Sequence, residues 1–526
     1  MDDVFFSPIR LHALQPSLLI PVAAVAILLW LSVAPSRAHR YAAMLPSASS
    51  ALPLLGDTLT AMFTHRRTLH TWLYHECQRF QGRPFVVRIL TKPPMVVLST
   101  VQAMEDVLKT HFDKFVKGYE FTEALRDLFG RGIFVTDGAT WHRQRKTASH
   151  LFSLHMMRDI MDAVMVEHSK QLCDIVGHAA KQGAVIDIKH LLELFTTDVF
   201  TKIGFGVDLR FMTSDQHEFF ERFGRVNHNL LYRQERPMAL WKLQNWLGLG
   251  LEKRQREDIA WLDKFVYKII EDSIARKAAE GMETTMTANK DLIRLFLDHP
   301  STTNDAGEPE YDVREIRDMA MAFISAGRDT TAYGMAWFVI MMDQFPDVQE
   351  CIREELREKV PQLMTGEIKA PNKEQTANLV YLEAAIKESL RLNPVIPLNT
   401  REASEDVVLS DGTFLAKGTQ VLLPAYAMAR MPSVWGPDAA TFNPDRWIDT
   451  ESGRLLAISP FQFLTFSAGP RVCLGRQFSI MEMKIALAAL LSKFRLAIDK
   501  DPRAFDYDAS LTLGVEGPIL LRPTLL

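Results

Sequence analysis

Segments with the hydrophobic spacing of an amphipathic helix fill the middle of the chain. From about residue 100 to 395, apolar positions recur with helical period between short polar breaks, which places them on one face of each helix. One segment is apolar on all sides. It follows Asp312, a capping residue with a glutamate three positions later, and ends before Pro346. The pattern predicts a mainly helical protein with one long, buried helix.

Segments with the character of a strand occur in two places. PFVVRIL (84–90) and PMVVLS (94–99) flank a turn and predict two paired strands. Later, DVVLSDGTFLAKGTQVLL (406–423) contains Asp411 and Gly412, the strongest short signal for a hairpin turn. The sequence therefore predicts a mainly α fold with a minor β region that is confined to these two patches.

The chain shows no internal linker. Its length alone suggests roughly three domains, but nothing between residues 60 and 526 has the composition of a linker. Three prolines between residues 35 and 53 interrupt the chain before the globular part begins. We expect one large domain over residues 57–526, preceded by a proline-containing hinge over residues 36–56.

An uncharged segment near the N-terminus differs from the rest of the chain. Ser17–Ala34 has 18 residues without a charge, which is enough for one bilayer span. Arg37 and Arg40 follow it and favour a cytosolic position for the rest of the chain. We expect a transmembrane anchor helix over residues 1–35. A cleaved signal peptide is the alternative, but the start Met-Asp-Asp lacks the basic cluster of such a peptide.

Charge and cysteine content exclude several classes of protein. The 526 residues include 60 basic and 64 acidic side chains, for a net charge of −4. The basic excess of a nucleic-acid-binding protein is absent, so we expect no nucleic-acid partner. The four cysteines form no CxxC pair, which argues against a disulfide framework or a zinc site and fits a reducing compartment.

One cysteine lies in a glycine-rich stretch, FSAGPRVCLG, directly before a helix predicted over Gln477–Phe494. A helix N-terminus stabilises a thiolate, Gly469 and Gly475 allow tight turns, and Arg471 offers donors for a carboxylate. A haem iron with its propionates requires such a set of groups. A structural cysteine in a glycine-rich turn has the same local features, so the local chemistry leaves both interpretations open.

The stretch resembles the haem-binding signature of the cytochrome P-450 superfamily, Phe-x-x-Gly-x-Arg-x-Cys-x-Gly. Phe466, Gly469, Arg471, Cys473 and Gly475 fill its fixed positions. The resemblance implies the cytochrome P-450 fold with a bound haem b. It also implies that Cys473 is the metal ligand and that the other four residues belong to the cofactor site.

Two further segments resemble parts of the family that bind the haem propionates. WHRQR matches the family's Trp-x-x-x-Arg and supplies Trp141 and Arg145, whose spacing places both side chains on one helix face. NTREA supplies Arg401, which resembles a family arginine near a propionate. The resemblance implies that these three residues bind the cofactor.

The segment AGRDTT resembles the oxygen-activation motif of the family. It lies in the long buried helix, where Ala326 and Gly327 are small enough to leave room for dioxygen. Thr330 is able to hydrogen-bond to the carbonyl four residues earlier, and Asp329 is an acid beside it. The resemblance implies that Asp329 and Thr330 are the catalytic residues and deliver protons.

ESLR matches the family's Glu-x-x-Arg and supplies Glu388 and Arg391. FNPDRW supplies Arg446, the second arginine that the family places on the same buried carboxylate, although Asp445 stands where the family more often has Glu. The resemblance implies that the three residues support the haem loop structurally and take no part in catalysis.

The implied reaction is monooxygenation, in which one oxygen atom of the co-substrate O2 enters a C–H bond of a lipophilic substrate. The resemblance implies that electrons pass from NADPH through a separate NADPH–cytochrome P-450 reductase. It further implies a single-pass protein of the endoplasmic reticulum membrane with a cytosolic catalytic domain.

Two longer segments, 112–153 and 426–447, resemble the branch that contains plant and fungal fatty-acid ω-hydroxylases and long-chain alkane hydroxylases. This implies a fatty acid as the substrate. A channel lined near Phe121, Leu125 and Phe323 would suit an alkyl chain, and core packing explains these side chains equally well. A sterol or other lipophilic substrate is the alternative. A fatty-acid hydroperoxide isomerase or dehydratase is a further one, but such an enzyme needs no proton-relay pair.

Overall fold

The computed structural model describes residues 36–526 except 54, 66, 154–159, 215–217, 281–290, 299–301, 304–308 and 311. The predicted anchor over residues 1–35 lies outside the described residues. Within the described ranges, no helix combines the length and the apolar character that crossing a bilayer requires.

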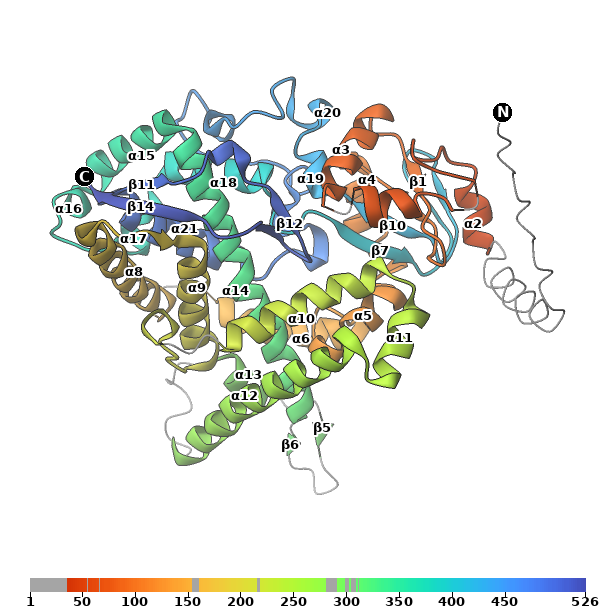
Figure 1. Cartoon of the computed structure of the whole chain (residues 1–526), viewed down its shortest axis with the longest axis horizontal. Coiled ribbons are helices and arrows are strands. Elements are labelled where there is room, and N and C mark those ends of the chain that lie inside the picture. Colours follow the sequence, from red (N-terminus) through yellow and green to blue (C-terminus); the bar gives the residue numbers. More distant parts are fainter. Residues whose placement is uncertain are drawn as a thin grey trace, which may run out of the picture.

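Helices make up most of the described chain, as the hydrophobic pattern predicts (Figure 1). The helices are α2 (Arg37–Ala42), α3 (Leu69–Arg79), α4 (Val101–Glu105), α5 (Tyr119–Phe129), α6 (Gly138–Ser149), α8 (Asp162–Gln182), α9 (Ile188–Phe205), α10 (Glu218–Glu235), α11 (Met238–Leu247), α12 (Gly250–Glu280), α13 (Leu292–Asp298), α14 (Val313–Gln344), α15 (Pro346–Lys359), α16 (Pro361–Met364), α17 (Lys373–Ala377), α18 (Val380–Leu392), α19 (Ala425–Met428), α20 (Pro432–Trp435) and α21 (Arg476–Leu491).

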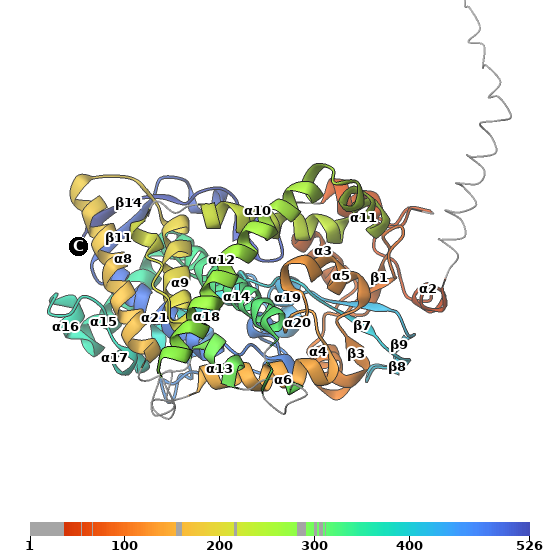
Figure 2. The ribbon, with the colours of Figure 1, turned by 90° about the horizontal axis from the view of Figure 1, so that it is seen from below.

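The largest sheet combines strands from the two ends of the chain. Its order is β1 (Phe85–Val87), β2 (Met95–Val97), β10 (Gln420–Leu423), β7 (Asn399–Ala403) and β3 (Phe115–Val116). β1 and β2 pair antiparallel, which confirms the first predicted pair of strands. β10 lies parallel to β2 and antiparallel to β7. This sheet and α2 lie at one end of the molecule and the C-terminus at the other (Figures 1 and 2).

Smaller strand pairs complete the β structure. They are β8 (Val407–Val408) with β9 (Phe414–Leu415), β12 (Tyr507–Ala509) with β13 (Leu513–Val515), β5 (Thr302–Thr303) with β6 (Pro309–Glu310), and a three-stranded sheet of β11 (Phe494–Ile498), β14 (Leu520–Leu525) and β4 (Ile186–Asp187). β8 and β9 confirm the predicted hairpin, and its Gly412 has a φ of +85°.

The prediction that strands are confined to two patches is wrong. β14 forms the centre of a C-terminal sheet, between β11 and β4. Pro523 lies within β14, and a proline within a run of residues argues against a central strand. The pairing with β4, more than 300 residues earlier in the chain, is a tertiary contact that no local pattern encodes.

α14 is the central helix of the fold (Figure 1). It begins as predicted, because the Asp312 carboxylate accepts hydrogen bonds from the backbone N–H groups of Arg314 at 2.9 Å and Glu315 at 3.1 Å. Most of its side chains are buried on every face. The all-round apolar pattern therefore predicted its burial correctly.

The described part of the predicted hinge packs onto the largest sheet. Ala42 and Ala48 are buried, and Ser47 forms an isolated β-bridge with Val86 of β1. Arg37 forms an ion pair with Asp406, with an N···O distance of 2.6 Å. Residues 36–56 are thus attached to the globular part, and the proposed domain boundaries stay a prediction.

Candidate active site

The loop that carries Cys473 is fixed at both of its sides. The backbone N–H of Cys473 donates to the Phe466 carbonyl at 2.8 Å, which closes the signature loop on itself. The Thr465 hydroxyl donates to the Leu390 carbonyl of α18 at 2.9 Å. α21 begins three residues after the cysteine, so the predicted position at the start of a helix is confirmed.

The two signature glycines have different roles. Gly469 has a φ of +65°, and a Cβ there would overlap the Leu108 carbonyl, so this position requires glycine both for its conformation and for close approach to the backbone. A Cβ at Gly475 would lie 3.7 Å from the Phe152 ring and 3.9 Å from the Cys473 sulfur. Gly475 thus leaves the space beside the sulfur open.

The electrostatic surroundings of the Cys473 sulfur favour a charge that has a partner. Cys473 keeps an accessible face, although protein atoms around the sulfur are dense enough to raise the pKa of the thiol by burial. The backbone N–H of Gly475, Arg145 and Arg476 oppose this increase. A buried anion is costly unless it is paired or bound to a metal, and a metal ion deprotonates a coordinating thiol outright.

Trp141 and Arg145 lie on one face of α6, as their spacing predicts. The Arg145 guanidinium lies 5.7 Å from the centroid of the indole ring, and its Nη2 donates to the Val472 carbonyl at 2.7 Å. The Arg471 guanidinium lies 4.3 Å from the same ring. Trp141 therefore holds two cations of the site in place.

A cluster of buried cations lies beside the cysteine loop. Burial and the neighbouring Arg471 lower the pKa of Arg401 to about 10. Burial likewise lowers the pKa of Arg471 to about 10, against the opposing effect of Asp137. Burial and then the two arginines lower the pKa of Lys117 well below its ordinary value. Arg471 donates to the Asp137 carboxylate at 2.5 Å. One carboxylate thus faces three cations.

This excess of positive charge is the feature that a haem with two propionates would balance. Arg401 and Arg471 lie where the resemblance implies a propionate site. Lys117 and Asp137 were missed in the sequence, because a single lysine before a glycine and a single aspartate before a helix carry no recognisable signal. The burial they share with two arginines appears only in the folded chain.

Thr330 makes the hydrogen bond that its position in α14 predicts. Its hydroxyl donates to the Ala326 carbonyl, four residues earlier, at 2.5 Å. The neighbouring Gly327 differs from expectation, because a Cβ there would clash with the Phe200 ring of α9. The small size of Gly327 therefore serves helix packing, and the expectation that it leaves room for dioxygen is wrong.

The Asp329 side chain extends toward α10. Its Oδ2 accepts a hydrogen bond from Asn227 Nδ2 at 2.9 Å, and its Oδ1 lies 3.2 Å from Arg328 Nη1. Burial raises the pKa of Asp329 to about 6, while Arg328 opposes this increase. Among the described residues, no hydrogen bond joins the side chains of Asp329 and Thr330. The two predicted catalytic residues are neighbours in α14 with separate partners.

Glu388 organises the structural cluster behind the loop. It receives two hydrogen bonds from Arg391, both 2.7 Å long, and one from Trp447 Nε1 at 2.9 Å. Arg446 Nε also contacts the Glu388 carboxylate, at 3.4 Å. Glu388 and Arg391 are fully buried. This geometry agrees with the predicted structural role of the three residues.

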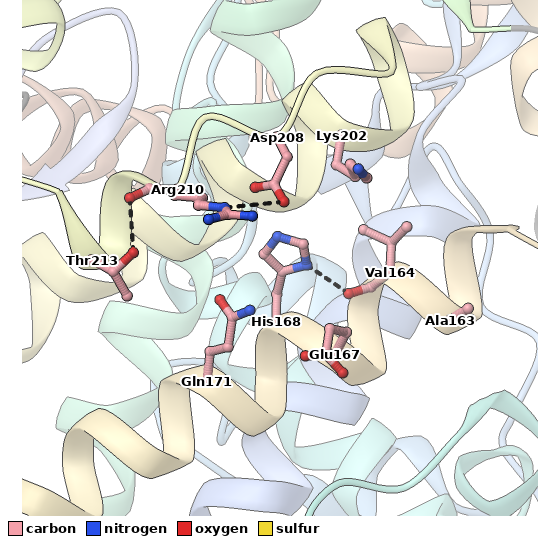
Figure 3. Close-up of a pocket in the computed structure, with 9 residues that line it drawn as sticks. All are labelled: Ala163, Val164, Glu167, His168, Gln171, Lys202, Asp208, Arg210 and Thr213. Carbon is pink, nitrogen blue, oxygen red and sulfur yellow. Dashed lines mark hydrogen bonds and ion pairs between the residues drawn. The ribbon is translucent and has the colours of Figure 1, made fainter.

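A pocket of about 550 Å³ lies elsewhere, between α8 and the segment that follows α9 (Figure 3). His168, Lys202 and Asp208 are among the residues that line it. None of the predicted site residues lines this pocket, so it is separate from the cysteine loop and from the cation cluster.

Comparisons with known proteins agree with the site. The family model described as "Cytochrome P450" matches residues 46–520. Cytochrome P450 CYP94D108 from Paris polyphylla is 33% identical over 433 residues, which cover 81% of this chain and 83% of the relative. Cytochrome P450 86B1 from Arabidopsis thaliana is 32% identical over 458 residues, covering 85% and 80%. Cytochrome P450 94C1 from Arabidopsis thaliana is 33% identical over 466 residues, covering 86% and 89%.

The residues of the site fit a haem with a thiolate ligand. An accessible cysteine sulfur lies at a helix N-terminus, buried cations exceed the carboxylates beside it, and a threonine interrupts the central helix. Members of the matched family use haem iron, O2 and electrons from a reductase to oxidise lipophilic substrates. From this geometry and from the family match over most of its length, we conclude that the chain belongs to the cytochrome P450 family and is a monooxygenase.

Proposed function

We propose that this monooxygenase hydroxylates a fatty acid at or near the ω end of its alkyl chain. The observation that carries the proposal is an apolar surface along α5 and α14. Leu125, Phe323 and Ile324 are buried in one apolar cluster, and Phe121 packs against it. Phe323 precedes Thr330 by about two helical turns. A surface of this kind suits an alkyl chain, and the resemblance of two long segments to the ω-hydroxylase branch supports the same substrate.

The protein's own residues would hold the cofactor and supply protons. Cys473 would bind the iron of haem b as a thiolate, and Lys117, Arg401 and Arg471 would hold the propionates. The bound haem supplies the activation of O2 and the oxidation of the C–H bond. The Thr330 hydroxyl and the Asp329 carboxyl group would pass protons toward the oxygen site. Burial of α14 keeps bulk water away from these groups.

We further propose that NADPH–cytochrome P450 reductase donates the electrons at the endoplasmic reticulum membrane, with the catalytic domain in the cytosol. The uncharged segment Ser17–Ala34 and the positive charges that follow it support an anchor. Leu243, Trp246 and Leu247 of α11 are each half exposed or more. α11 lies at the same end of the molecule as α2 (Figures 1 and 2), so this apolar surface suits contact with the same bilayer.

The test is turnover of the full chain in membranes with reductase and NADPH. Lauric and oleic acid are supplied separately, and the products are separated by mass spectrometry. We expect ω- or near-ω-hydroxylated acids that require NADPH. Hydroxylation of a sterol with no hydroxylated fatty acid would contradict the proposed substrate. Consumption of a fatty-acid hydroperoxide without NADPH would instead identify an isomerase or dehydratase.

A further inference from the structure

We propose that Asn227 of α10 is a positioning residue that serves the Asp329 carboxyl group in both of its protonation states. The proposal deepens the proposed function, because it rests on the role of Asp329 in proton delivery. Asn227 and Asp329 are 102 residues apart in the chain. Their contact joins α10 to the central helix at the predicted oxygen-activation motif.

The contact between the two side chains is direct and buried. Asn227 Nδ2 lies 2.9 Å from Asp329 Oδ2, and Asp329 is 3% exposed. Asn227 Oδ1 and Asp329 Oδ1 are also buried, and neither has a hydrogen-bond partner among the described residues. Each side chain thus presents one satisfied and one unsatisfied oxygen or nitrogen position at the same place in the fold.

An amide is the side chain that matches an acid which gains and loses a proton. The NH2 group of Asn227 donates to an ionised carboxylate, and the amide oxygen accepts from a protonated carboxylic acid after rotation of the amide by 180°. A lysine or arginine at this position offers only donors and favours the ionised form alone. The unsatisfied oxygen of Asn227 is therefore the acceptor that the protonated form of Asp329 needs.

The other groups around Asp329 leave its protonation open to control from α10. Arg328 favours the ionised form and Glu193 of α9 opposes it. Asp329 in turn helps to raise the pKa of Tyr333, one turn further along α14. Phe220 and Phe223 of α10 hold the Arg328 guanidinium, with distances to the ring centroids of 4.8 and 5.3 Å.

α10 thus contacts both the acid and the cation beside it. Burial raises the pKa of Asp329 to about 6, close to the pH at which a proton donor works best. A change of the side chain at position 227 is therefore expected to move the proton affinity of Asp329 without altering the residues that hold the haem.

The experiment measures the carboxylic-acid C=O band of Asp329 in the haem-loaded full chain by infrared difference spectroscopy as a function of pH. The band is assigned by its loss in Asp329→Asn. We expect Asn227→Lys to lower the titration midpoint and Asn227→Leu to raise it, each by about one pH unit or more. Asn229→Leu is the matched control, because Asn229 is equally buried on α10 but contacts Glu252. It should leave the midpoint unchanged.

A second readout links the acid to the reaction. With the midpoint lowered by one unit, about tenfold less Asp329 is protonated at pH 7, so Asn227→Lys should release a larger share of its reducing equivalents as hydrogen peroxide. If neither Asn227 variant moves the midpoint, the proposal is wrong. If Asn227→Lys fails to bind haem, the direction of the shift in Asn227→Leu decides alone.

The two proposals fail in distinguishable ways. A midpoint that shifts while the peroxide share stays constant supports the positioning role of Asn227 and contradicts proton delivery by Asp329. An absence of fatty-acid hydroxylation leaves the infrared titration unaffected and contradicts only the proposed substrate.

Discussion

Single side chains in this protein combine charge with burial at the points where the chemistry requires both. Cys473 lies between the Gly475 N–H, Arg145 and Arg476, which favour its anion, and an environment that disfavours it. Lys117, Arg401 and Arg471 are cations in a setting that lowers the pKa of each. Such groups are costly in a folded chain without a ligand of opposite charge, which explains why they occur together.

The first prediction concerns the metal ligand. Cys473→Ser replaces the soft sulfur with a hydroxyl that is a poor ligand for haem iron. After reduction with dithionite and exposure to carbon monoxide, the variant should lack the red-shifted Soret band of a thiolate-bound haem. Cys351→Ser is the control, because Cys351 is exposed and free, and it should keep the band. Retention of the band in the Cys473 variant would exclude this residue as the ligand.

The second prediction concerns the hydroxyl in the central helix. Thr330→Ala removes the group that bonds to the Ala326 carbonyl and, in our proposal, a proton carrier. Reducing equivalents should then appear as hydrogen peroxide in place of product. Thr201→Ala removes the same type of bond to a carbonyl four residues earlier, in α9, and should leave coupling unchanged. Equal coupling in both variants would count against a relay through Thr330.

The third prediction concerns a buried acid outside the proposed chemistry. Glu482 of α21 is fully buried, and both carboxylate oxygens lack hydrogen-bond partners among the described residues. Burial raises its pKa well above the ordinary value. A raised pKa in the folded state means that Glu482 favours folding below its unfolded pKa. This contribution is lost as the pH rises toward the folded value.

Glu482→Gln should therefore increase the free energy of unfolding at pH 8, on the order of 1–3 kcal/mol, and flatten its dependence on pH. Denaturant unfolding of the parent and the variant at pH 5 and pH 8 measures both effects. A larger gain at pH 5 than at pH 8 would contradict the neutral, buried acid.

Whole elements depend on close contacts between helices. α14 and α9 share an extensive contact, and they approach each other where Gly327 meets the Phe200 ring. The fourth prediction is that Gly327→Ala destabilises the fold by about 1–3 kcal/mol, the usual cost of overpacking a core. Thermal unfolding measures the effect, and Phe200→Leu in the same chain should restore part of the loss.

Gly224 on α10 provides the matched control for this prediction. A Cβ at Gly224 would meet no atom within 4 Å, so Gly224→Ala should be neutral or should stabilise the helix by up to about 1 kcal/mol. Equal destabilisation by the two substitutions would show that helix propensity, and not the contact with Phe200, explains the effect at Gly327.

The elements that the sequence predicts are those with a local cause. The cap at Asp312, the all-round apolar pattern of α14 and the turn at Asp411–Gly412 depend on neighbours in the chain, and each is present. β14 was not predicted, because its partner β4 is distant in sequence and its proline obscures the strand pattern. Length and periodicity are therefore sufficient for helices here and insufficient for the C-terminal sheet.

The same distinction applies to the site. Cys473, Arg471 and Trp141 follow from motifs with fixed spacing, and the folded chain brings them into one region. Lys117 and Asn227 belong to no motif, since each acts through a partner on another element. Their roles depend on tertiary contacts.

At the scale of the whole molecule, one carboxylate holds several distant segments together. Glu388 joins α18 to the chain around Arg446 and Trp447. The fifth prediction is that Glu388→Ala leaves Arg391 buried without its partner. The expected cost is about 3–5 kcal/mol, and we expect the yield of haem-loaded protein to fall sharply.

Glu350→Ala is the control for the fifth prediction. Glu350 pairs with Arg357 at 2.8 Å at the surface, where an ion pair contributes about 1 kcal/mol or less. Haem content and the midpoint of thermal unfolding measure both variants. If Glu388→Ala loads haem as efficiently as Glu350→Ala, the cluster has no supporting role.

The interleaved largest sheet determines the order in which the newly synthesised chain is completed. β10 occupies the position between β2 and β7, so β2 emerges from the ribosome long before its neighbour exists. Until then its open hydrogen-bonding edge is a template for pairing with other chains. Truncated products that end before residue 420 should therefore aggregate through β2, and a chaperone that covers this edge during translation should improve the yield of the complete protein.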